Sequence, residues 1–348
     1  MSSNNNTINV QQEQEQEQIS TYIGLKGYSI YKEFMDEKEL KTLREDMTVR
    51  PYMPKSPIQP PSFPIYRESK TKIYIPRNYG MLTYGDPDEL RIPKGDDINL
   101  PFNGEMREYQ KNIVSIYMNS ATKTNKEGKE FGGGGLLEVP CGRGKTVIAC
   151  KIMSELKKKA LVIVHKSFLA DQWIERISEF LPTARVGKIQ GQIIDIENKD
   201  IVIGMLQSLS QKDYPGDLFD SFGISIYDET HHLGAEVFSK SMMKCMTNYT
   251  LGLSGTMQRK DGLTKVFKMF LGNIIHKEKS NTSEHDVLVK GINYKVDDAE
   301  FNEMKYDYRG NPLYSTMISK LCNFNRRSEF ILNVLKNENS IYYYLTSH

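Results

Sequence analysis

The sequence predicts an α/β fold built on a parallel sheet, and three observations support this prediction. A strand-like run at 135–139 is followed by a glycine-containing loop and then by apolar residues at helical spacing over 147–156. Residues 160–165 form a continuous apolar run, which is typical of a strand buried on both faces. Two further short apolar runs, 223–227 and 249–254, each end in polar residues. Strands that alternate with helices in this way indicate a parallel sheet.

A phosphate-binding loop is predicted between the first strand and the first helix. Glycines let backbone N–H groups turn inward around a polyphosphate, a lysine supplies positive charge, and a threonine hydroxyl can bind Mg²⁺. Val139 occupies the place of the first glycine in G-x-x-x-x-G-K-[ST], and an isolated Gly-Lys-Thr can also be a simple turn before a helix. The flanking strand and helix favour a nucleoside triphosphate site. Its residues are Pro140, Cys141, Gly142, Arg143, Gly144, Lys145 and Thr146.

Two adjacent carboxylates follow the strand at 223–227. Asp228 and Glu229 come at the C-terminal end of that strand, at the sheet edge where the phosphate loop is also expected. Asp228 can hold the Mg²⁺ that bridges the terminal phosphates, and Glu229 can polarise the attacking water. The competing interpretation is that both residues only cap a helix that begins near Ala235. The preceding phosphate loop favours the catalytic interpretation, with Lys145 as the third catalytic residue.

The order of the motifs resembles that of a known family. After the phosphate loop and Asp-Glu-x-His at 228–231, the strand at 249–254 leads into Ser254-Gly255-Thr256 and Arg-Lys-Asp-Gly at 259–262. These elements resemble motifs I, II and III of superfamily 2 helicases, and are most similar to the XPB and UvsW-like branch, in particular the helicases of large nucleocytoplasmic DNA viruses. The resemblance implies a RecA-like P-loop NTPase lobe that uses ATP and Mg²⁺, preceded by a small β-containing accessory region.

The resemblance also implies roles for individual residues. Arg107 and Gln110, within Met-Arg-Glu-Tyr-Gln at 106–110, are implied to read the adenine. The implied nucleic-acid contacts are Lys166 in an element similar to motif Ia, Gln207 and Ser208 in the next such element, and Arg259. The implied coupling residues between the nucleotide and the nucleic acid are His231, Ser254, Gly255 and Thr256. The family usually carries alanine in place of Gly255. This departure affects the coupling between the nucleotide and the nucleic acid.

A complete member of this family has a second RecA-like lobe whose arginines reach the terminal phosphate. We recognise no such segment here, and residues 340–348 resemble only the first strand of that lobe. In other phosphoryl-transfer enzymes such an arginine contributes roughly 10³ to 10⁵ in rate. We therefore expect a second lobe as a partner, in the same or another polypeptide, and slow or no hydrolysis by these residues alone.

Composition limits the partners and the compartment. The net charge is +2, which is too small to attract nucleic acid to the whole surface, so binding depends on local basic patches. The four cysteines have neither metal-like spacing nor the pattern of a disulfide framework, which predicts an intracellular, reducing compartment, the host cytoplasm or the virion for a viral protein. No apolar run approaches membrane-spanning length, so no membrane partner is expected.

Four regions are predicted along the chain: a disordered Asn-, Gln- and Glu-rich tail (1–19), an accessory region (20–104), the ATP-binding lobe (105–278), and linker helices with the start of a second lobe (279–348). Six prolines between 51 and 64 exclude helix there, and short strands are expected in the accessory region. The accessory region either supports the ATP-binding lobe structurally, which we favour, or contacts duplex nucleic acid. A strand is expected at 287–296.

Three local interpretations complete the prediction. The glycines at 132–135 are expected to form a loop or turn before the first strand. The lysines at 157–159 are interpreted as a solvated helix end rather than a nucleic-acid patch. Trp173 is interpreted as a core residue rather than a base-stacking platform.

Two functions from different classes remain. The first is an ATP-dependent helicase or translocase that acts on nucleic acid, with DNA favoured over RNA. The second is a nucleic-acid-binding regulatory module that holds ATP without productive hydrolysis. Lys145, Asp228 and Glu229 favour the first function, whereas the lack of a recognised second lobe favours the second.

Overall fold

The computed structural model describes residues 19–52, 59–122, 124, 128, 130–229, 235–258, 261–278, 292–308 and 310–336. The chain divides into one compact unit up to residue 280 and a second unit that follows it. The predicted tail, except for Ile19, and the strand expected at 340–348 lie outside the described residues.

An eight-stranded sheet organises the first unit, in the order β11-β10-β12-β9-β13-β14-β8-β15. Every neighbouring pair is parallel except β10 and β11. The predicted α/β fold with a parallel sheet is therefore confirmed. The strands are β8 (Gly133–Glu138), β9 (Ala160–Val164), β10 (Val186–Gln190), β11 (Ile193–Asp195), β12 (Ile201–Met205), β13 (Ile224–Tyr227), β14 (Tyr249–Ser254) and β15 (Ile274–Lys277).

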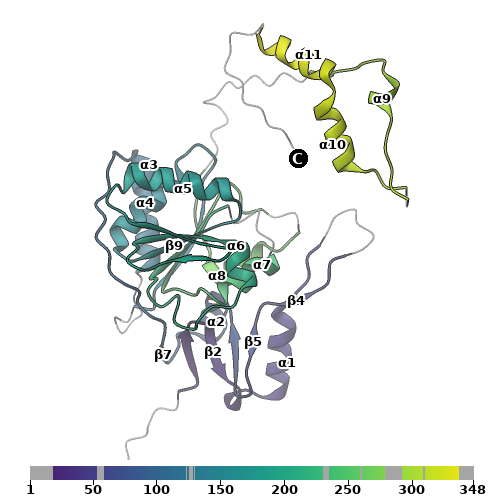
Figure 1. Ribbon diagram of the computed structural model, residues 1–348. Helices are drawn as coiled ribbons and strands as arrows, with labels where there is room; N and C mark the ends of the chain where they lie inside the picture. The colour runs from purple at the N-terminus through teal and green to yellow at the C-terminus, as the bar shows by residue number, and fades with distance from the viewer. Residues whose placement is uncertain are drawn as a thin grey trace, which may run out of the picture. The chain divides into compact units, whose positions relative to one another are not determined.

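Helices cover both faces of this sheet (Figure 1). Because successive strand residues point to opposite faces, Leu136 and Leu161 enter one hydrophobic core while Leu137 and Val162 enter the other. The core of Leu137 and Val162 is shared with α3 (Glu108–Ala121), α4 (Lys145–Leu156) and α5 (Ser167–Phe180). The opposite core is shared with α6 (Leu206–Gln211), α7 (Ala235–Met242) and α8 (Thr264–Leu271).

The N-terminal region forms a second sheet of five strands, in the order β5-β6-β2-β1-β7. No helix occurs at 51–52 or 59–64, the described part of the proline-rich segment, and helices lie on either side of it. The region therefore contains the short strands that were predicted, together with two helices. Its elements are β1 (Thr21–Gly24), β2 (Gly27–Tyr31), a 3₁₀ turn (Lys32–Phe34), α1 (Glu37–Asp46), β3 (Thr48–Val49), β4 (Phe63–Pro64), β5 (Arg67–Glu68), β6 (Lys72–Ile75), α2 (Arg77–Tyr84) and β7 (Glu89–Leu90).

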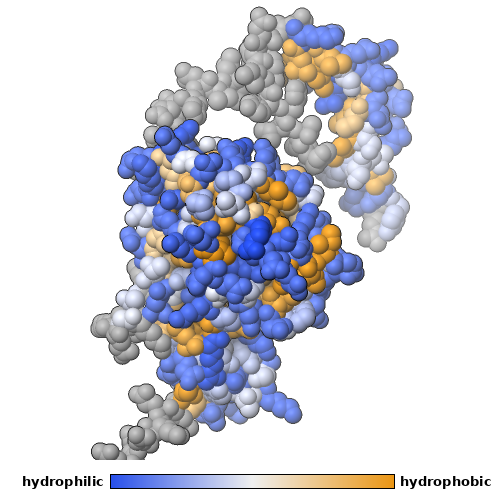
Figure 2. Space-filling model, turned by 60° about the vertical axis from the view of Figure 1, so that its left-hand side comes forward, coloured by the Kyte–Doolittle hydropathy of each residue, from blue (hydrophilic) through white to orange (hydrophobic). Residues whose placement is uncertain are grey.

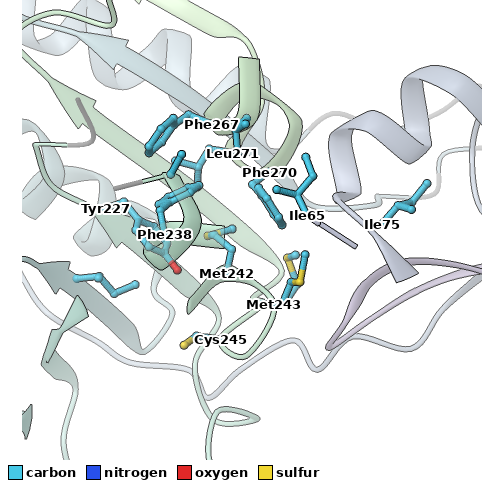
Figure 3. Packing of buried hydrophobic residues seen from close by; sticks show 14 of the residues in the cluster. Ile65, Ile75, Tyr227, Phe238, Met242, Met243, Cys245, Phe267, Phe270 and Leu271 are labelled. Atoms are coloured by element: carbon cyan, nitrogen blue, oxygen red, sulfur yellow. The ribbon is translucent and has the colours of Figure 1, made fainter. Parts of the chain in front are cut away.

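The N-terminal region and the main sheet share one hydrophobic core. Figure 3 shows Ile65 and Ile75 of the N-terminal region in the same cluster as Phe270 of α8 and Met243, the residue after α7. Phe238 packs against Phe267, with ring centroids 4.1 Å apart, and extends this cluster toward β13. The two regions are therefore continuous through their buried side chains.

A buried arginine strengthens the same junction. Arg77, the first residue of α2, is 1% exposed. Its guanidinium donates hydrogen bonds to the backbone oxygens of Phe131, Thr247 and Asn248, at 2.7 Å for Asn248. Burial lowers the pKa of Arg77 to about 10. These carbonyls lie just before β8 and β14, so Arg77 ties α2 to the start of two central strands.

The glycine run departs from its predicted form. Gly133, Gly134 and Gly135 are strand residues of β8 and pair with Tyr249, Thr250 and Leu251 of β14. A Cβ atom on Gly135 would lie 2.7 Å from the Ile275 side chain, and one on Gly134 would lie 1.7 Å from Thr250 O. The prediction of a loop was wrong because these glycines permit close packing inside a strand.

The lysine triplet also differs from its interpretation as a solvated helix end. Lys157 is exposed and caps α4, with φ 54°. However, Lys158 Nζ lies 2.7 Å from Asp97 Oδ1, and Lys159 is buried and donates to Ile196 O at 2.9 Å. Burial lowers the pKa of Lys159. Two of the three lysines therefore hold neighbouring segments together.

The second unit contains α9 (Ala299–Asn302), α10 (Tyr314–Asn323) and α11 (Asn325–Lys336). The expected strand at 287–296 is absent from its described part, 292–296, while the expected helices are present. Rings of Tyr294, Phe301 and Phe324 contact one another there. Hydrophobic side chains, including Ile318, Leu321 and Leu332, are exposed on this unit, which carries orange patches in Figure 2.

None of the helices in the described residues combines the length and the apolar character that a membrane span requires.

Candidate functional site

The predicted phosphate loop joins β8 to α4 at the C-terminal edge of the main sheet. Gly142 and Gly144 both have φ 78°, a left-handed conformation that favours glycine. Gly144 precedes the first residue of α4, and a Cβ atom there would lie 2.5 Å from Gln110 Nε2. The first turn of α4 contains Lys145 and Thr146, and its backbone N–H groups have no partner within the helix. This arrangement suits an anion such as a polyphosphate.

The two carboxylates follow β13, two strands away from β8 in the same sheet. Asp228 is buried; its Oδ2 accepts a hydrogen bond from Trp173 Nε1 at 2.8 Å and its Oδ1 accepts one from Glu229 N at 2.9 Å. Burial raises the pKa of the Asp228 carboxyl, and the Trp173 bond opposes this effect. Neither Trp173 nor Glu229 belongs to α7, and the choice between the catalytic and the capping interpretation stays a prediction.

An ion pair brings the phosphate loop and the carboxylates together. Lys145 Nζ lies 3.0 Å from Glu229 Oε1, and both side chains are mostly buried, at 10% and 19% exposed. The Lys145 ammonium also lies 3.9 Å from Cys141 Sγ. Glu229 has φ 50°, which is uncommon for a residue other than glycine. Residues 84 positions apart in the sequence therefore meet at one point.

The turn after β14 lies against the phosphate loop. Ser254 donates a hydrogen bond to Thr256 O at 2.5 Å, and Gln258 N donates one to Thr256 Oγ1 at 3.2 Å. A Cβ atom on Gly255 would lie 3.6 Å from Cys141 Sγ and 3.8 Å from Lys145 Nζ, which are ordinary van der Waals distances. The turn therefore lies beside the loop, and an alanine at Gly255 would fit.

Arg107 and Gln110, predicted to read the adenine, lie at the start of α3 beside the loop. Gln110 is buried, and its Oε1 accepts from Arg107 N at 3.0 Å while its Nε2 donates to Arg143 O at 3.3 Å. Tyr109 donates to the same oxygen of Arg143 at 3.1 Å. Gln110 therefore supports the phosphate loop, Arg107 is exposed, and their contact with adenine stays a prediction.

The predicted nucleic-acid residues follow β9 and β12, which pair in parallel with Met205 opposite Val164. Lys166 and Gln207 are exposed at the same sheet edge. Ser208 is half-buried, and its Oγ accepts a hydrogen bond from Gly191 N at 2.9 Å. These three residues are thus gathered at the ends of neighbouring strands, while His231 and Arg259 lie outside the described residues.

Sequence reasoning missed two sets of contacts. Trp173 is in the core as interpreted, 1% exposed, but its link to Asp228 was not foreseen. Arg143 was assigned only to the loop, yet its guanidinium lies 5.1 Å from the Tyr109 ring centroid and 4.0 Å from Glu278 Oε1. The signals available in the sequence were weak: a single tryptophan, and an aromatic residue next to Gln110.

The donor set at this site fits Mg²⁺ bound together with phosphates. The Thr146 hydroxyl, next to Lys145 in the sequence, and the Asp228 carboxylate, next to Glu229, are hard oxygen donors. Within the described parts of the chain, no group of three or more His, Cys, Asp or Glu side chains could hold a metal by itself. Mg²⁺ commonly takes one or two protein ligands and completes its shell with phosphate oxygens and water.

Comparison with known proteins gives a consistent set of relatives. Residues 103–259 match the family described as "Type III restriction enzyme, res subunit". A protein of Acanthamoeba polyphaga mimivirus named "Putative ATP-dependent RNA helicase L396" is 35% identical over 330 residues, covering 91% of this chain and 61% of that protein. "DNA 3'-5' translocase XPB2" of Sulfurisphaera tokodaii is 29% identical over 229 residues, covering 64% of this chain and 48% of that protein.

Among solved structures, the UvsW helicase from bacteriophage T4 is similar, with a TM-score of 0.47 and 16% identity over 69% of this chain and 94% of that chain. The present chain spans 61% of the length of the mimivirus relative and 48% of the archaeal one.

Proposed function

We propose that this chain is the ATP-binding lobe of an ATP-dependent nucleic-acid translocase or helicase of superfamily 2. Residues 103–259 match the "Type III restriction enzyme, res subunit" family, and similar proteins are named a viral helicase and an XPB translocase. The observation that carries the proposal is the 3.0 Å ion pair between Lys145 of the phosphate loop and Glu229 of the carboxylate pair. It joins the two groups that phosphoryl transfer to water requires.

The phosphates of ATP would bind in the loop between β8 and α4. Lys145 would supply positive charge to the terminal phosphates, and the N–H groups of the first turn of α4 would bind their oxygens. Left-handed Gly142 and Gly144 let the backbone approach these oxygens closely. Arg107 and Gln110, at the start of α3, would lie toward the adenine.

Thr146 and Asp228 would hold Mg²⁺ beside the phosphates, and the bound ion would offset the charge that develops on them. The two fixed donors on Asp228, Trp173 Nε1 and Glu229 N, keep its carboxylate in one orientation. Trp173 and the surrounding core exclude water from that side of the carboxylate.

Glu229 would accept the proton of the attacking water. As the water oxygen bonds to the terminal phosphorus and the bond to the β,γ-bridging oxygen breaks, a Glu229 oxygen would take the released proton. For this to happen, Lys145 must leave Glu229 and turn its ammonium to the phosphates. ATP binding would therefore replace Glu229 by the phosphates as the partner of Lys145.

The nucleic acid would lie along the ends of β9 and β12, across Lys166, Gln207 and Ser208. Positive charge and hydrogen-bond donors at this edge suit a phosphate backbone, and such contacts weaken as salt rises. DNA is favoured because one relative is named a DNA translocase, and RNA is the other candidate because another is named an RNA helicase. The turn at Ser254, Gly255 and Thr256, together with His231, would relay the nucleotide state to this edge.

A second RecA-like lobe, in cis or in trans, would complete the cleft. It would supply the arginine that reaches the terminal phosphate and a second surface for the nucleic acid. Such an arginine is worth roughly 10³ to 10⁵ in rate. The residues of this chain alone are therefore expected to bind ATP more effectively than they hydrolyse it.

The function is tested by ATPase rates with a second lobe supplied, in the presence of single-stranded DNA, duplex DNA or RNA. We expect at least one nucleic acid to stimulate turnover, and Glu229→Gln to abolish the stimulated rate. Glu236→Gln, which changes an exposed carboxylate on α7, serves as the matched control. ATP binding without turnover under every condition would instead indicate a regulatory module.

A further inference from the structure

Trp173 makes a specific polar contact inside the hydrophobic core. It lies on α5 and is 1% exposed, between Ala170 and Ile177 on the buried face of the helix. Its indole Nε1 donates a hydrogen bond to Asp228 Oδ2 at 2.8 Å, across 55 positions of sequence. A buried indole N–H needs an acceptor, and here the acceptor is a carboxylate of the candidate site.

The contact fixes the orientation of a buried carboxylate. Asp228 Oδ1 accepts from Glu229 N at 2.9 Å, so each carboxylate oxygen accepts one hydrogen bond. Two such donors define the plane of the carboxyl group and leave its remaining lone pairs in set directions. The indole N–H can only donate, so it pairs well with a carboxylate oxygen.

The same helix carries a residue assigned to the nucleic-acid edge. Lys166 immediately precedes α5, and Ala170, Trp173 and Ile177 follow at helical spacing on the buried face. These three buried side chains hold the helix against the sheet. A hydrogen bond from α5 to Asp228 therefore links the segment that begins at Lys166 to the carboxylate.

We propose that Trp173 is a positioning residue that orients Asp228 for Mg²⁺-nucleotide binding and connects it to the helix that begins beside Lys166. This inference rests on the proposed nucleotide site. Hydrogen-bond partners of metal ligands typically change metal affinity 10- to 100-fold when they are removed. Trp173 thus acts through Asp228 and touches neither ATP nor the metal.

Trp173→Phe separates positioning from packing, because it keeps an aromatic ring and removes the N–H donor. We expect the Mg²⁺ concentration needed for half-maximal binding of a fluorescent ATP analogue to rise at least about 10-fold. Binding of the same analogue in EDTA should stay unchanged. Phe222→Leu is the matched control, because it alters a buried aromatic residue that precedes β13, whereas the carboxylates follow that strand. It should leave the Mg²⁺ requirement unchanged.

A double-mutant cycle tests the pathway through Asp228. If Trp173 acts by orienting this carboxylate, Trp173→Phe should add no further effect in an Asp228→Ala background. If Trp173→Phe raises the Mg²⁺ requirement by the same factor with and without Asp228→Ala, Trp173 contributes only packing.

Intrinsic fluorescence provides a second readout that needs no substitution at Trp173. The sequence contains one tryptophan, so the protein's indole emission reports on this residue alone. In the unmodified protein, Mg²⁺-ATP should change the emission more than ATP with EDTA does. In Asp228→Ala, the two additions should change the emission equally. This measurement remains decisive if Trp173→Phe fails to fold.

The outcomes distinguish this inference from the proposed function. If the unmodified protein binds Mg²⁺-ATP through Lys145, but neither the emission nor the Mg²⁺ requirement responds as stated, the positioning role is wrong and the nucleotide site stands. If the unmodified protein binds no Mg²⁺-ATP, both the site and the role of Trp173 are wrong.

Discussion

Lys145 Nζ lies 3.0 Å from Glu229 Oε1, so the residue expected to bind phosphate and the residue expected to activate water form one ion pair. Glu229 reaches this position from a left-handed backbone conformation, φ 50°, which costs a non-glycine residue on the order of 1–3 kcal/mol. Backbone strain of this kind is concentrated at functional sites. In the proposed mechanism this pair opens when ATP binds.

Glu229→Gln is expected to retain or improve ATP binding and to lose turnover. The amide keeps the shape of the side chain but removes both the proton acceptor and the negative charge that holds Lys145. The ion pair between Lys145 and Glu229 competes with the phosphates for Lys145 and is worth about 1 kcal/mol. Its loss should therefore raise Mg²⁺-ATP affinity by roughly fivefold at most. Turnover should fall on the order of 10² to 10⁴-fold. Calorimetry and a stimulated ATPase assay measure the two effects, and unchanged turnover would assign proton transfer to another group.

Arg77→Met is expected to destabilise the first unit strongly. The substitution leaves the backbone oxygens of Phe131, Thr247 and Asn248 without their guanidinium donor in a buried site. We expect the free energy of unfolding to fall by about 3 kcal/mol, measured by urea denaturation. Arg176→Met, which removes an exposed arginine paired with Glu179, should cost less than about 1 kcal/mol. Equal losses for both variants would show that Arg77 does not hold the junction together.

The ion pairs of Glu68 should make the stability of the protein depend on pH. Hydrogen bonding to Arg44, with a further contribution from Lys32, lowers the pKa of Glu68 from 4.5 to about 2. Because the folded pKa lies below the unfolded one, this contribution is present above pH 4.5 and is lost as the pH falls toward 2. Glu68→Gln should therefore lower Tm at neutral pH, and the difference from the unmodified protein should narrow across that window.

Arg44→Met provides the matched variant, because it removes the largest cause of the shift while leaving the carboxylate in place. Its Tm difference from the unmodified protein should narrow over the same pH range. A difference that stays constant from neutral pH to pH 2.5 in both variants would contradict this role of the pair.

Much of the site could be predicted because parallel strands place their C-terminal ends along one edge. The strands before Lys145, Asp228 and Ser254 were visible as apolar runs, and β13, β14 and β8 are neighbours in the sheet. Polar residues that follow such runs must therefore lie near one another. Local pattern and topology were sufficient for this part of the site.

Contacts that depend on individual side chains could not be predicted in the same way. The core position of Trp173 was predicted, but its N–H partner depends on how α5 lies across the sheet. Arg77 follows a proline and would ordinarily be placed at the surface, yet it is buried against three carbonyls. The strand pairing of Gly133–Glu138 depends on close neighbours, Thr250 and Ile275, that are distant in sequence.

If the loop between β8 and α4 binds Mg²⁺-ATP through Lys145, calorimetric titration should show weaker nucleotide binding by Lys145→Ala. Lys151→Ala, on the same helix, is the control, because Lys151 pairs with Glu155 rather than with the site. Loss of a charged hydrogen bond worth about 1.5–3 kcal/mol predicts at least a tenfold weaker Kd for Lys145→Ala, with an unchanged circular dichroism spectrum. The same Kd for Lys145→Ala and the unmodified protein would mean that the loop does not bind Mg²⁺-ATP through Lys145.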